Sequence, residues 1–455
     1  MKYYCIVFAF FMLMLVLSGC NTSKEEPVSQ AYVENVQITT QEPAHNTANE
    51  PVHFTAVGMG SSHAIAITDN GEVYTWGGNR LGELGLGDTI ERKIPTKIPD
   101  LTDIVAVSLG DHSSAAITSN GDLYTWGNNK YGQLGLGDTE DRHTPEKVSG
   151  LPKIVSISMG YWNGAAITED GDLYAWGIND KGQLGHSSTT FNQFRGSYTA
   201  IPTKVSGITN IISASVIRFE SLAAVSESGD LYVLGHNRNG QLGLGDNEDR
   251  HTPTKVPGLP RVTAVSSNEH IAIITEDGNL YTWGTNNQGQ LGYPESDPDS
   301  PSLIRGYDSS RTDANRIFDG KKVDFYTPGS SNRVPRAVSG LSDVVAISVA
   351  YGHTAAITAN GDLYTWGLNT SGELGYESST VISFGSMETI YFSFTGIPTK
   401  VPDLQNIVSV SVGRHTSSAV TADGGLYTWG NAGNNLLGDG TSENRNTPVR
   451  ITQVH

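Results

Sequence analysis

The sequence has 455 residues, of which 52 are glycine and 17% are charged. Acidic side chains outnumber Lys and Arg by 47 to 29, giving a formal net charge of -18. Binding to nucleic acid requires a basic surface that displaces counterions from the phosphates, so this charge argues against a nucleic-acid partner. The many glycines and few charged residues favour short strands and tight turns over helices. An all-β protein is therefore expected.

Residues 1–19 have the pattern of an export signal. Lys2 precedes the apolar run Ile6–Leu17, which is too short to span a membrane comfortably. The tetrapeptide Leu17–Cys20 resembles the lipobox of bacterial lipoproteins, in which the cysteine is acylated before the signal is removed. We expect an exported lipoprotein held on the extracytoplasmic side of a membrane through acylated Cys20 only. An ordinary secretory signal with a chance cysteine is the alternative.

The segment after the signal, residues 20–51, is a different kind of sequence. It is rich in Thr, Ser, Glu, Gln, Asn and Pro and has no sustained apolar period, which is typical of a disordered polar tether. Cys5 and Cys20 are the two cysteines of the sequence. Since the first leaves with the signal and the second is acylated, the expected mature chain has no disulfide.

Residues 52–455 contain a seven-residue motif, the repeated phrase, that occurs seven times. Its second copy, Gly121–Gly127, reads Gly-Asp-Leu-Tyr-Thr-Trp-Gly. The seven copies begin at Gly71, Gly121, Gly171, Gly229, Gly278, Gly361 and Gly424. A repeat of about 50 residues, rich in β-branched and aromatic residues between glycines, indicates a closed array such as a propeller.

The second repeat predicts four strands. The first three are expected at Ile104–Leu109, Ala115–Thr118 and Asp122–Trp126, with a turn at the Asn-Gly pair before the third. A fourth is expected around Lys147–Val148, opened by Pro145, because proline suits an edge strand that donates to no further ladder. Four strands in each of seven repeats predict a seven-bladed β-propeller of four-stranded blades.

The chain resembles the regulator of chromosome condensation repeat family. The resemblance covers roughly residues 52–452 and is carried in the second repeat by His112, Ala115–Thr118, Asp122–Asn129 and Gly132–Asp138. It implies the propeller fold and places the two ends of the array side by side. It does not select one function, because similar propellers include a nuclear guanine-nucleotide exchange factor, a plant ultraviolet receptor, domains of ubiquitin ligases and a secreted bacterial β-lactamase inhibitor.

Three repeats carry insertions between the third and fourth strands. From the glycine of the Gln/Glu-Leu-Gly triplet to the following proline, repeats 1, 2 and 4 span 10 positions: Gly85–Pro95, Gly135–Pro145 and Gly243–Pro253. Repeats 3, 5 and 6 span 17, 43 and 23 positions: Gly185–Pro202, Gly292–Pro335 and Gly375–Pro398. The inserted loops, 186–200, 293–334 and 376–397, occupy one topological slot, so they are expected on one face of the disc.

These loops are rich in aromatic residues, which often anchor binding surfaces. The candidates for partner binding are Phe191, Phe194, Tyr198, Tyr307, Phe318, Phe325, Tyr326, Phe384, Tyr391, Phe392 and Phe394. Two alternatives stay open from the sequence. The aromatic side chains could pack the loops onto one another or into an extra β-hairpin, or the loops could be disordered.

Recurring polar residues are interpreted as structural. Five histidines precede the second strand in five repeats: His63, His112, His270, His353 and His415. We expect buried core histidines rather than metal ligands, since repeats 3 and 4 have Trp162 and Glu220 there. Asp88, Asp138 and Asp246 are expected to cap turns by accepting hydrogen bonds from backbone amides. No metal site and no cofactor is predicted.

The usual catalytic and phosphate-binding motifs are missing from the sequence, and no pair of acidic residues can be assigned as acid and nucleophile. The sequence thus favours a non-enzymatic module that binds an unknown protein partner through the inserted-loop face. The alternative is a carbohydrate-binding or glycan-cleaving envelope protein that uses the same face. A guanine-nucleotide exchange-like regulator is disfavoured, because an exported lipoprotein would not meet a cytosolic or nuclear GTPase.

Overall fold

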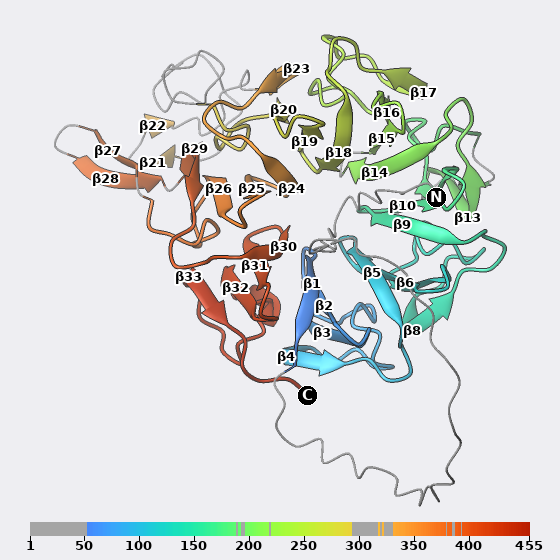
Figure 1. Cartoon of the computed structure of the whole chain (residues 1–455), viewed down its shortest axis with the longest axis horizontal. Helices are drawn as coiled ribbons and strands as arrows, with labels where there is room; N and C mark the ends of the chain where they lie inside the picture. The colour runs from blue at the N-terminus through green and yellow to red at the C-terminus, as the bar shows by residue number, and fades with distance from the viewer. Residues whose placement is uncertain are drawn as a thin grey trace, which may run out of the picture.

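The computed structural model describes residues 52–187, 190–192, 196–217, 220–293, 317–318, 321–322, 331–378, 380–384, 387–392 and 394–455. These residues form seven antiparallel four-stranded sheets that stand around a central axis like the blades of a fan (Figure 1). The helical content of the described residues is one short 3-10 turn, η1 (Gly433–Asn435). The prediction of an all-β, seven-bladed propeller of four-stranded blades is confirmed.

Each blade is built from consecutive strands in the order inner to outer. Blade 1 contains β1 (Phe54–Met59), β2 (His63–Thr68), β3 (Val73–Gly77) and β4 (Arg92–Lys97). Blade 2 contains β5 (Ile104–Leu109), β6 (Ser113–Thr118), β7 (Leu123–Gly127) and β8 (Arg142–Lys147). Blade 3 contains β9 (Ile154–Met159), β10 (Asn163–Thr168), β11 (Leu173–Ile178) and β13 (Gly196–Lys204), with the additional strand β12 (Thr190–Asn192).

The remaining blades follow the same order. Blade 4 contains β14 (Ile211–Ile217), β15 (Ser221–Ser226), β16 (Leu231–Gly235) and β17 (Arg250–Lys255). Blade 5 contains β18 (Val262–Ser267), β19 (His270–Thr275), β20 (Leu280–Thr285) and β23 (Ser331–Ala337). Blade 6 contains β24 (Val344–Val349), β25 (His353–Thr358), β26 (Leu363–Leu368) and β29 (Phe394–Lys400). Blade 7 contains β30 (Ile407–Val412), β31 (Thr416–Thr421), β32 (Leu426–Gly430) and β33 (Arg445–Arg450).

The core lies between the blades and is built around the tryptophan of the repeated phrase. Trp126 of blade 2 is fully buried against Ile65 and Ile67 of blade 1, and its indole nitrogen donates to the carbonyl oxygen of Glu83 at 2.8 Å. The same hydrogen bond, from an indole nitrogen to a carbonyl oxygen of the preceding blade, is made by Trp76, Trp176, Trp283, Trp366 and Trp429. Blade 4 has Leu234 at this position, also fully buried. The indole therefore supplies both apolar area and a satisfied polar contact at six junctions.

The fourth strand differs from its prediction in position. In blade 2 it runs over Arg142–Lys147, so Pro145 lies inside the strand and does not open it. The ladder with β7 is irregular between the pairs Thr125↔Glu146 and Gly127↔Arg142, and the proline falls in this irregular stretch. Its missing N–H is tolerated there, because the strand is also the outer edge of the blade.

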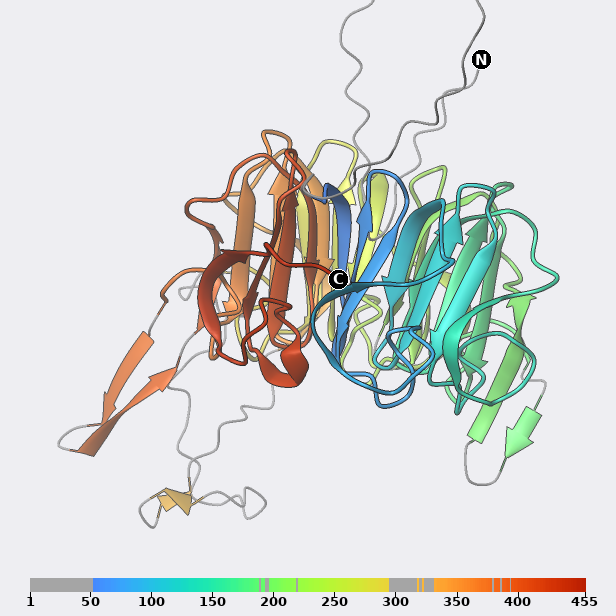
Figure 2. The ribbon, with the colours of Figure 1, turned by 90° about the horizontal axis from the view of Figure 1, so that it is seen from below.

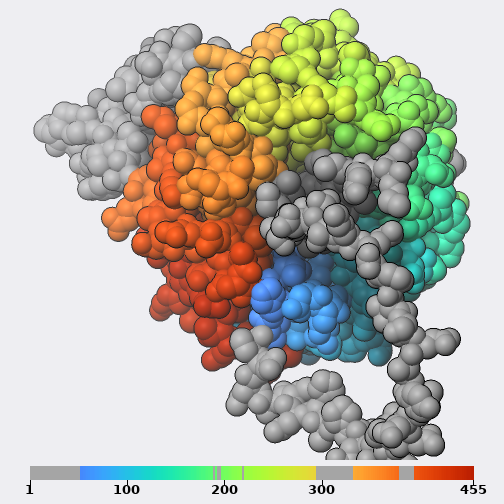
Figure 3. Space-filling model, viewed as in Figure 1, coloured from blue at the N-terminus to red at the C-terminus, as the bar shows by residue number. Residues whose placement is uncertain are grey.

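The ring closes without an exchange of strands, because β1 begins blade 1 and β33 ends blade 7. The first and last blades lie side by side in Figures 1 and 3. The amide of Phe54 donates to the carbonyl oxygen of Gly424 at 3.1 Å, and the amide of Met59 donates to Ser411 Oγ at 2.9 Å. Beyond β33, the backbone amide of His455 donates to the carbonyl oxygen of Pro95 at 2.8 Å. The backbone amide of Lys97 donates to the main-chain oxygen of His455 at 2.7 Å. The C-terminal tail thus adds a pairing to the outer edge of blade 1.

Candidate binding face

The insertions emerge on one face of the disc. Within a blade the first and third strands run in the same direction, because each is antiparallel to the second. The loops after the first strand and the loops after the third strand therefore share one face. In Figure 2, β12 and the two-stranded hairpins β21 (Ile317–Phe318)–β22 (Lys321–Lys322) and β27 (Thr380–Phe384)–β28 (Met387–Phe392) all project on the same side of the disc. We call this side the insertion face.

The insertion of blade 3 is partly continuous with its sheet. Phe191 of β12 pairs with Ser197 of β13, and Tyr198 of β13 pairs with Ile178 of β11. The Asp180 carboxylate accepts a hydrogen bond of 2.6 Å from the Ser197 amide, which fixes the base of the hairpin. Phe191 is 76% exposed, whereas Tyr198 is half-buried. Phe191 therefore presents its ring to solvent from an anchored hairpin.

The other predicted aromatic residues divide into three groups. Phe394 is half-buried at the start of β29 and pairs with Leu368 of β26. Phe318, Phe384, Tyr391 and Phe392 lie on described strands, but their side chains are outside the described residues. Phe194, Tyr307, Phe325 and Tyr326 lie outside the described residues, as does Cys20.

Three exposed aliphatic residues that we did not predict mark the same blades. Ile201, Val334 and Ile397 are 58%, 49% and 52% exposed and directly precede the proline of the fourth strand in blades 3, 5 and 6. The equivalent residues of blades 2, 4 and 7 are threonines, Thr144, Thr252 and Thr447. Blade 1, which has no insertion, has the half-buried Ile94 at this position. The three blades with insertions differ from it in that their aliphatic residue is exposed.

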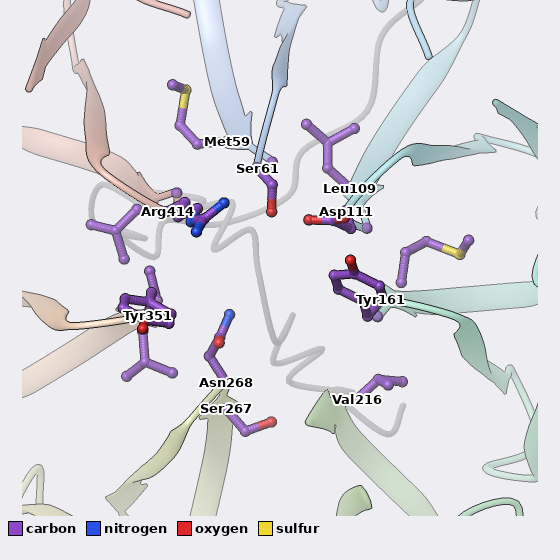
Figure 4. A pocket seen from close by; sticks show the side chains of 18 residues that line it. Met59, Ser61, Leu109, Asp111, Tyr161, Val216, Ser267, Asn268, Tyr351 and Arg414 are labelled. Carbon is purple, nitrogen blue, oxygen red and sulfur yellow. The ribbon is translucent and has the colours of Figure 1, made fainter. Parts of the chain in front are cut away.

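The mouth of the central channel opens on the insertion face. It is a hollow with a cavity volume of about 80 Å³ at the ends of the seven first strands. Figure 4 shows Ser61, Asp111 and Tyr161 on one side of the hollow and Asn268, Tyr351 and Arg414 on the other. The Arg414 guanidinium lies 5.8 Å from the centre of the Tyr351 ring. The mouth is therefore polar, with aromatic and charged groups that a ligand could contact.

Two buried glutamates lie beside the mouth, each paired with a histidine of the next blade. Glu83 Oε1 is 2.9 Å from His112 Nδ1, and His112 Nε2 is 3.2 Å from Asp111 Oδ2. Glu373 Oε1 is 3.1 Å from His415 Nδ1. Four of the other blades have glutamine at the glutamate position: Gln133, Gln183, Gln241 and Gln290. Glutamate thus occurs where the following blade has its histidine one residue before the second strand, as His112 and His415 are.

The first pair shifts both pKa values. The hydrogen bond to Glu83 is the main reason that the pKa of His112 is raised above its ordinary value. Burial alone would raise the pKa of Glu83, but the bond from His112, the nearby His63 and hydrogen bonds from backbone amides together hold that pKa below its ordinary value. A raised histidine pKa stabilises the fold below about pH 6.5, and a lowered glutamate pKa stabilises it above about pH 4.5. The pair therefore stabilises the fold most between these two values.

Replacing Glu83 with Gln should remove this pH dependence. We expect the variant to lose stability relative to the parent near pH 5.5 and to differ less at pH 9, as His112 loses its proton with rising pH. The difference should stay within about 1 kcal/mol, because the imidazole is 43% exposed and solvent screens the pair. Urea unfolding at the two pH values measures it. A difference that is equal at both would contradict the ion pair.

The five periodic histidines fall into two classes. His63, His270 and His353 are fully buried, and their Nε2 atoms lie 2.9, 2.7 and 3.0 Å from a hydroxyl oxygen of the next blade. Burial lowers their pKa values to about 4, 3 and 4, so these side chains are neutral. For them the expectation of core histidines is correct. It is wrong for His112 and His415, which are partly exposed because they lie one position earlier, where the side chain meets the triplet glutamate.

The three aspartates that follow Gly-Leu-Gly cap turns, as predicted. Asp88, Asp138 and Asp246 each accept a hydrogen bond of 3.0 Å from the amide two residues later. Each also pairs with an arginine four residues later, at 2.7, 2.6 and 2.5 Å. Within the described ranges, no three His, Cys, Asp or Glu side chains gather in a way that could hold a metal ion. Across the same ranges, no helix has the length and apolar character needed to cross a bilayer.

Comparison with known proteins identifies the repeat. The regulator of chromosome condensation (RCC1) repeat matches residues 70–117, 120–167, 170–217, 228–273, 277–313, 360–420 and 423–454, more than half of the chain. The chain belongs to the RCC1 repeat family. RCC1 repeats thus account for every blade of the ring, and the resemblance seen in the sequence is confirmed at the level of the family.

The similar curated proteins include a plant receptor and a human ubiquitin ligase. The chain is 30% identical over 256 residues to the ultraviolet-B receptor UVR8 of Arabidopsis thaliana, covering 55% of this chain and 48% of the receptor. It is 34% identical over 311 residues to the human E3 ubiquitin-protein ligase HERC2, covering 56% of this chain and 6% of the ligase. The chain therefore spans about half or less of the length of these relatives.

Solved structures share the RCC1 fold. Yeast RCC1 (Prp20), solved with Kap60 bound, superposes with a TM-score of 0.68 at 21% identity, covering 92% of this chain and 91% of the yeast chain. Human WBSCR16 gives a TM-score of 0.66 at 20% identity, covering 84% and 94%. At these identities the structures show a common fold and do not identify a partner of this chain.

Proposed function

We propose that this chain is a lipid-anchored, extracytoplasmic propeller that binds a protein partner through its insertion face and has no enzymatic activity. The observation that carries the proposal is the common slot of the three insertions. Blades 3, 5 and 6 lengthen the same loop, while the loop in blades 1, 2 and 4 keeps one length. A requirement of the fold alone would not place the added chain in one slot on one face.

Local features of the insertion face support this proposal. Phe191 projects an exposed ring from a hairpin that Asp180 holds in place, and aromatic residues on fixed supports are common interface anchors. Ile201, Val334 and Ile397 add apolar area beside the insertions. Yeast RCC1 has been solved with Kap60, and Prp20p has been studied for its binding to Gsp1p and histones, so related propellers bind proteins. The sequence around Cys20 supports the anchor.

A cross-linking pull-down from the native envelope tests the proposal. The full-length chain is compared with a variant in which the loops of blades 3, 5 and 6 are replaced by the blade 2 loop between Gly135 and Pro145. We expect the parent to capture one dominant protein and the trimmed variant to lose at least about 90% of it, as expected when interface anchors are removed. Exchanging the blade 4 loop for the equally long blade 2 loop is the matched control and should change nothing.

The anchor is tested in the same cells. We expect Cys20→Ser to abolish labelling by a radioactive fatty acid and to leave residues 1–19 attached, because acylation of a lipoprotein precedes removal of its signal. If the trimmed but folded variant captures the same protein as the parent, the insertion face is not the binding site. If Cys20→Ser is labelled by the fatty acid as strongly as the parent, the anchor is not acylated Cys20.

A further inference from the structure

Two opposite charges share the hollow at the channel mouth without pairing with each other. Asp111 of blade 2 and Arg414 of blade 7 both line the hollow, and in Figure 4 their charged groups lie on either side of Ser61 of blade 1. Among the described residues, the ion pairs with an N–O distance of 4.0 Å or less do not include one between Asp111 and Arg414. A space that can hold part of a ligand therefore separates the two charges.

The three residues hold the same position in consecutive blades. Each directly follows a glycine at the end of a first strand, and these glycines are Gly413, Gly60 and Gly110. The blades approach closely there, because a Cβ on Gly413 would lie 2.6 Å from the Gly60 carbonyl oxygen and one on Gly60 would lie 3.1 Å from the Gly110 carbonyl oxygen. The close backbone contact brings the three following side chains next to one another along the rim of the hollow.

The fold does not require a charge at this position. In blades 3 and 6 the same position holds Tyr161 and Tyr351, which also line the hollow. Arginine, serine, aspartate and tyrosine thus occupy one place in the fold, while the strands on either side keep the pattern of the repeat. Positions at which repeats differ on a common scaffold are where a repeat protein builds its binding site.

The Asp111 side chain contributes negative charge at a mostly buried place. It is 10% exposed, and its Oδ2 lies 3.2 Å from His112 Nε2. The Nδ1 atom of the same imidazole lies 2.9 Å from Glu83 Oε1. Two carboxylates therefore share one imidazole, which carries at most a single positive charge, so the group has an excess of negative charge. A mostly buried carboxylate with an unbalanced charge favours binding of a cation.

The Arg414 guanidinium supplies the site for an anion. It is exposed and lies 5.8 Å from the centre of the Tyr351 ring. No carboxylate of the described residues lies within 4.0 Å of its nitrogen atoms. A guanidinium presents parallel N–H donors that match the two oxygens of a carboxylate. The hydroxyl group of Ser61, between the two charges, can donate a hydrogen bond or accept one.

We propose that the channel mouth binds a small zwitterion with a primary ammonium group and a carboxylate, which is the chemistry of an amino acid or a short peptide. The carboxylate of the ligand accepts from Arg414, and its ammonium group donates to Asp111. A ligand with one charge leaves the other protein charge unpaired, so the hollow favours a molecule with both. The hollow of about 80 Å³ admits several non-hydrogen atoms, since about 10–15 Å³ holds one water. This binding goes beyond the proposed protein interaction.

Calorimetry with three unbranched ligands tests the proposal. The full-length protein is titrated separately with glycine, diglycine and triglycine, in which the two charges lie progressively further apart. We expect at least one of them to bind, and the best one reports the spacing of the protein charges. Acetylation of its amino group, or amidation of its carboxylate, should weaken binding about tenfold, because each removes one charged contact. Binding of none of the three, or equal binding of the capped forms, would overturn the proposal.

Two variants, each checked for folding by circular dichroism, assign the charges to the ends of the ligand. Asp111→Asn should weaken binding of the uncapped ligand about tenfold but leave the acetylated form unaffected, because that form has no ammonium group. Arg414→Gln should likewise weaken the uncapped ligand but leave the amidated form unaffected. Asp122→Asn makes the same change as Asp111→Asn in the turn between β6 and β7 on the opposite face, so it is the matched control and should change no affinity.

The variants also separate this site from the protein interface. If Asp111→Asn or Arg414→Gln is folded and binds the uncapped ligand as tightly as the parent does, the proposal is overturned. It is overturned as well if Asp122→Asn weakens the ligand as much as Asp111→Asn does. Loss of the captured protein in both mouth variants, with no binding of the three ligands to the parent, would assign the two charges to the protein interface and contradict a zwitterion site.

Discussion

Deleting residues 448–455 is expected to destabilise the propeller by roughly 5 kcal/mol, since several backbone hydrogen bonds, one buried aliphatic side chain and one partly buried aliphatic side chain are lost together. The deletion removes the end of β33 and the tail that pairs with the outer edge of blade 1 through Pro95 and Lys97. It also removes Ile451 and Val454, which pack against the cluster between blades 7 and 1. An opened ring exposes strand edges, so we expect aggregation on heating as well.

Urea unfolding followed by circular dichroism measures this effect, with His455→Ala as control. The bonds of His455 to blade 1 are made by backbone atoms, so removal of the imidazole should leave the unfolding midpoint unchanged. If the deletion variant unfolds at the midpoint of the parent, the tail does not close the ring, and the remaining contacts between Phe54 and Gly424 and between Met59 and Ser411 would be sufficient.

Trp126→Leu is expected to cost about 3 kcal/mol, because it leaves a cavity at the junction of blades 1 and 2 and removes the bond to the Glu83 carbonyl oxygen. Leucine is tolerated at the equivalent Leu234, where Leu184 and Val205 pack in the same cluster. At Trp126 the space is shaped for an indole, since a Cβ on Gly85 would lie 2.8 Å from the indole nitrogen. The change in the urea midpoint reports the loss.

Trp162→Leu is the matched control for this substitution. It makes the same chemical change at a partly exposed site, so we expect a stability change within about 1 kcal/mol. The contrast separates the tryptophans that hold the ring together from the one that the fold does not need. Equal losses at the two positions would contradict the assignment of Trp162 to the surface.

Much of the fold could be predicted because the same pattern of strands and turns recurs in each repeat. The alternation in Ile104–Leu109 and the Asn-Gly turn before Leu123 correctly indicated the first three strands of blade 2. The fourth strand was displaced because Pro145 was taken as its start, whereas the irregular pairing with β7 accommodates proline inside the strand. Whether the chain ends share a blade depends on pairing between residues about 400 positions apart, a separation that local patterns do not encode.

The site was harder to predict, because its contacts join different blades. Glu83 and His112 are 29 positions apart and meet only after two blades have packed. A usable signal was nevertheless present: glutamate replaces glutamine at positions 83 and 373, and histidine follows in the next repeat at 112 and 415. The contact of Trp162 with Tyr131 could not be predicted, because the two residues belong to different blades.

Site-specific photo-cross-linking in the native envelope tests the central claim, that the insertion face binds the partner. One variant carries a photoreactive phenylalanine analogue in place of Phe191, and the other carries it in place of Asn120, an exposed residue in the turn between β6 and β7 on the opposite face. We predict a discrete cross-linked protein from position 191 and none from position 120. Cross-linking of the same protein from position 120, with none from position 191, would contradict the account.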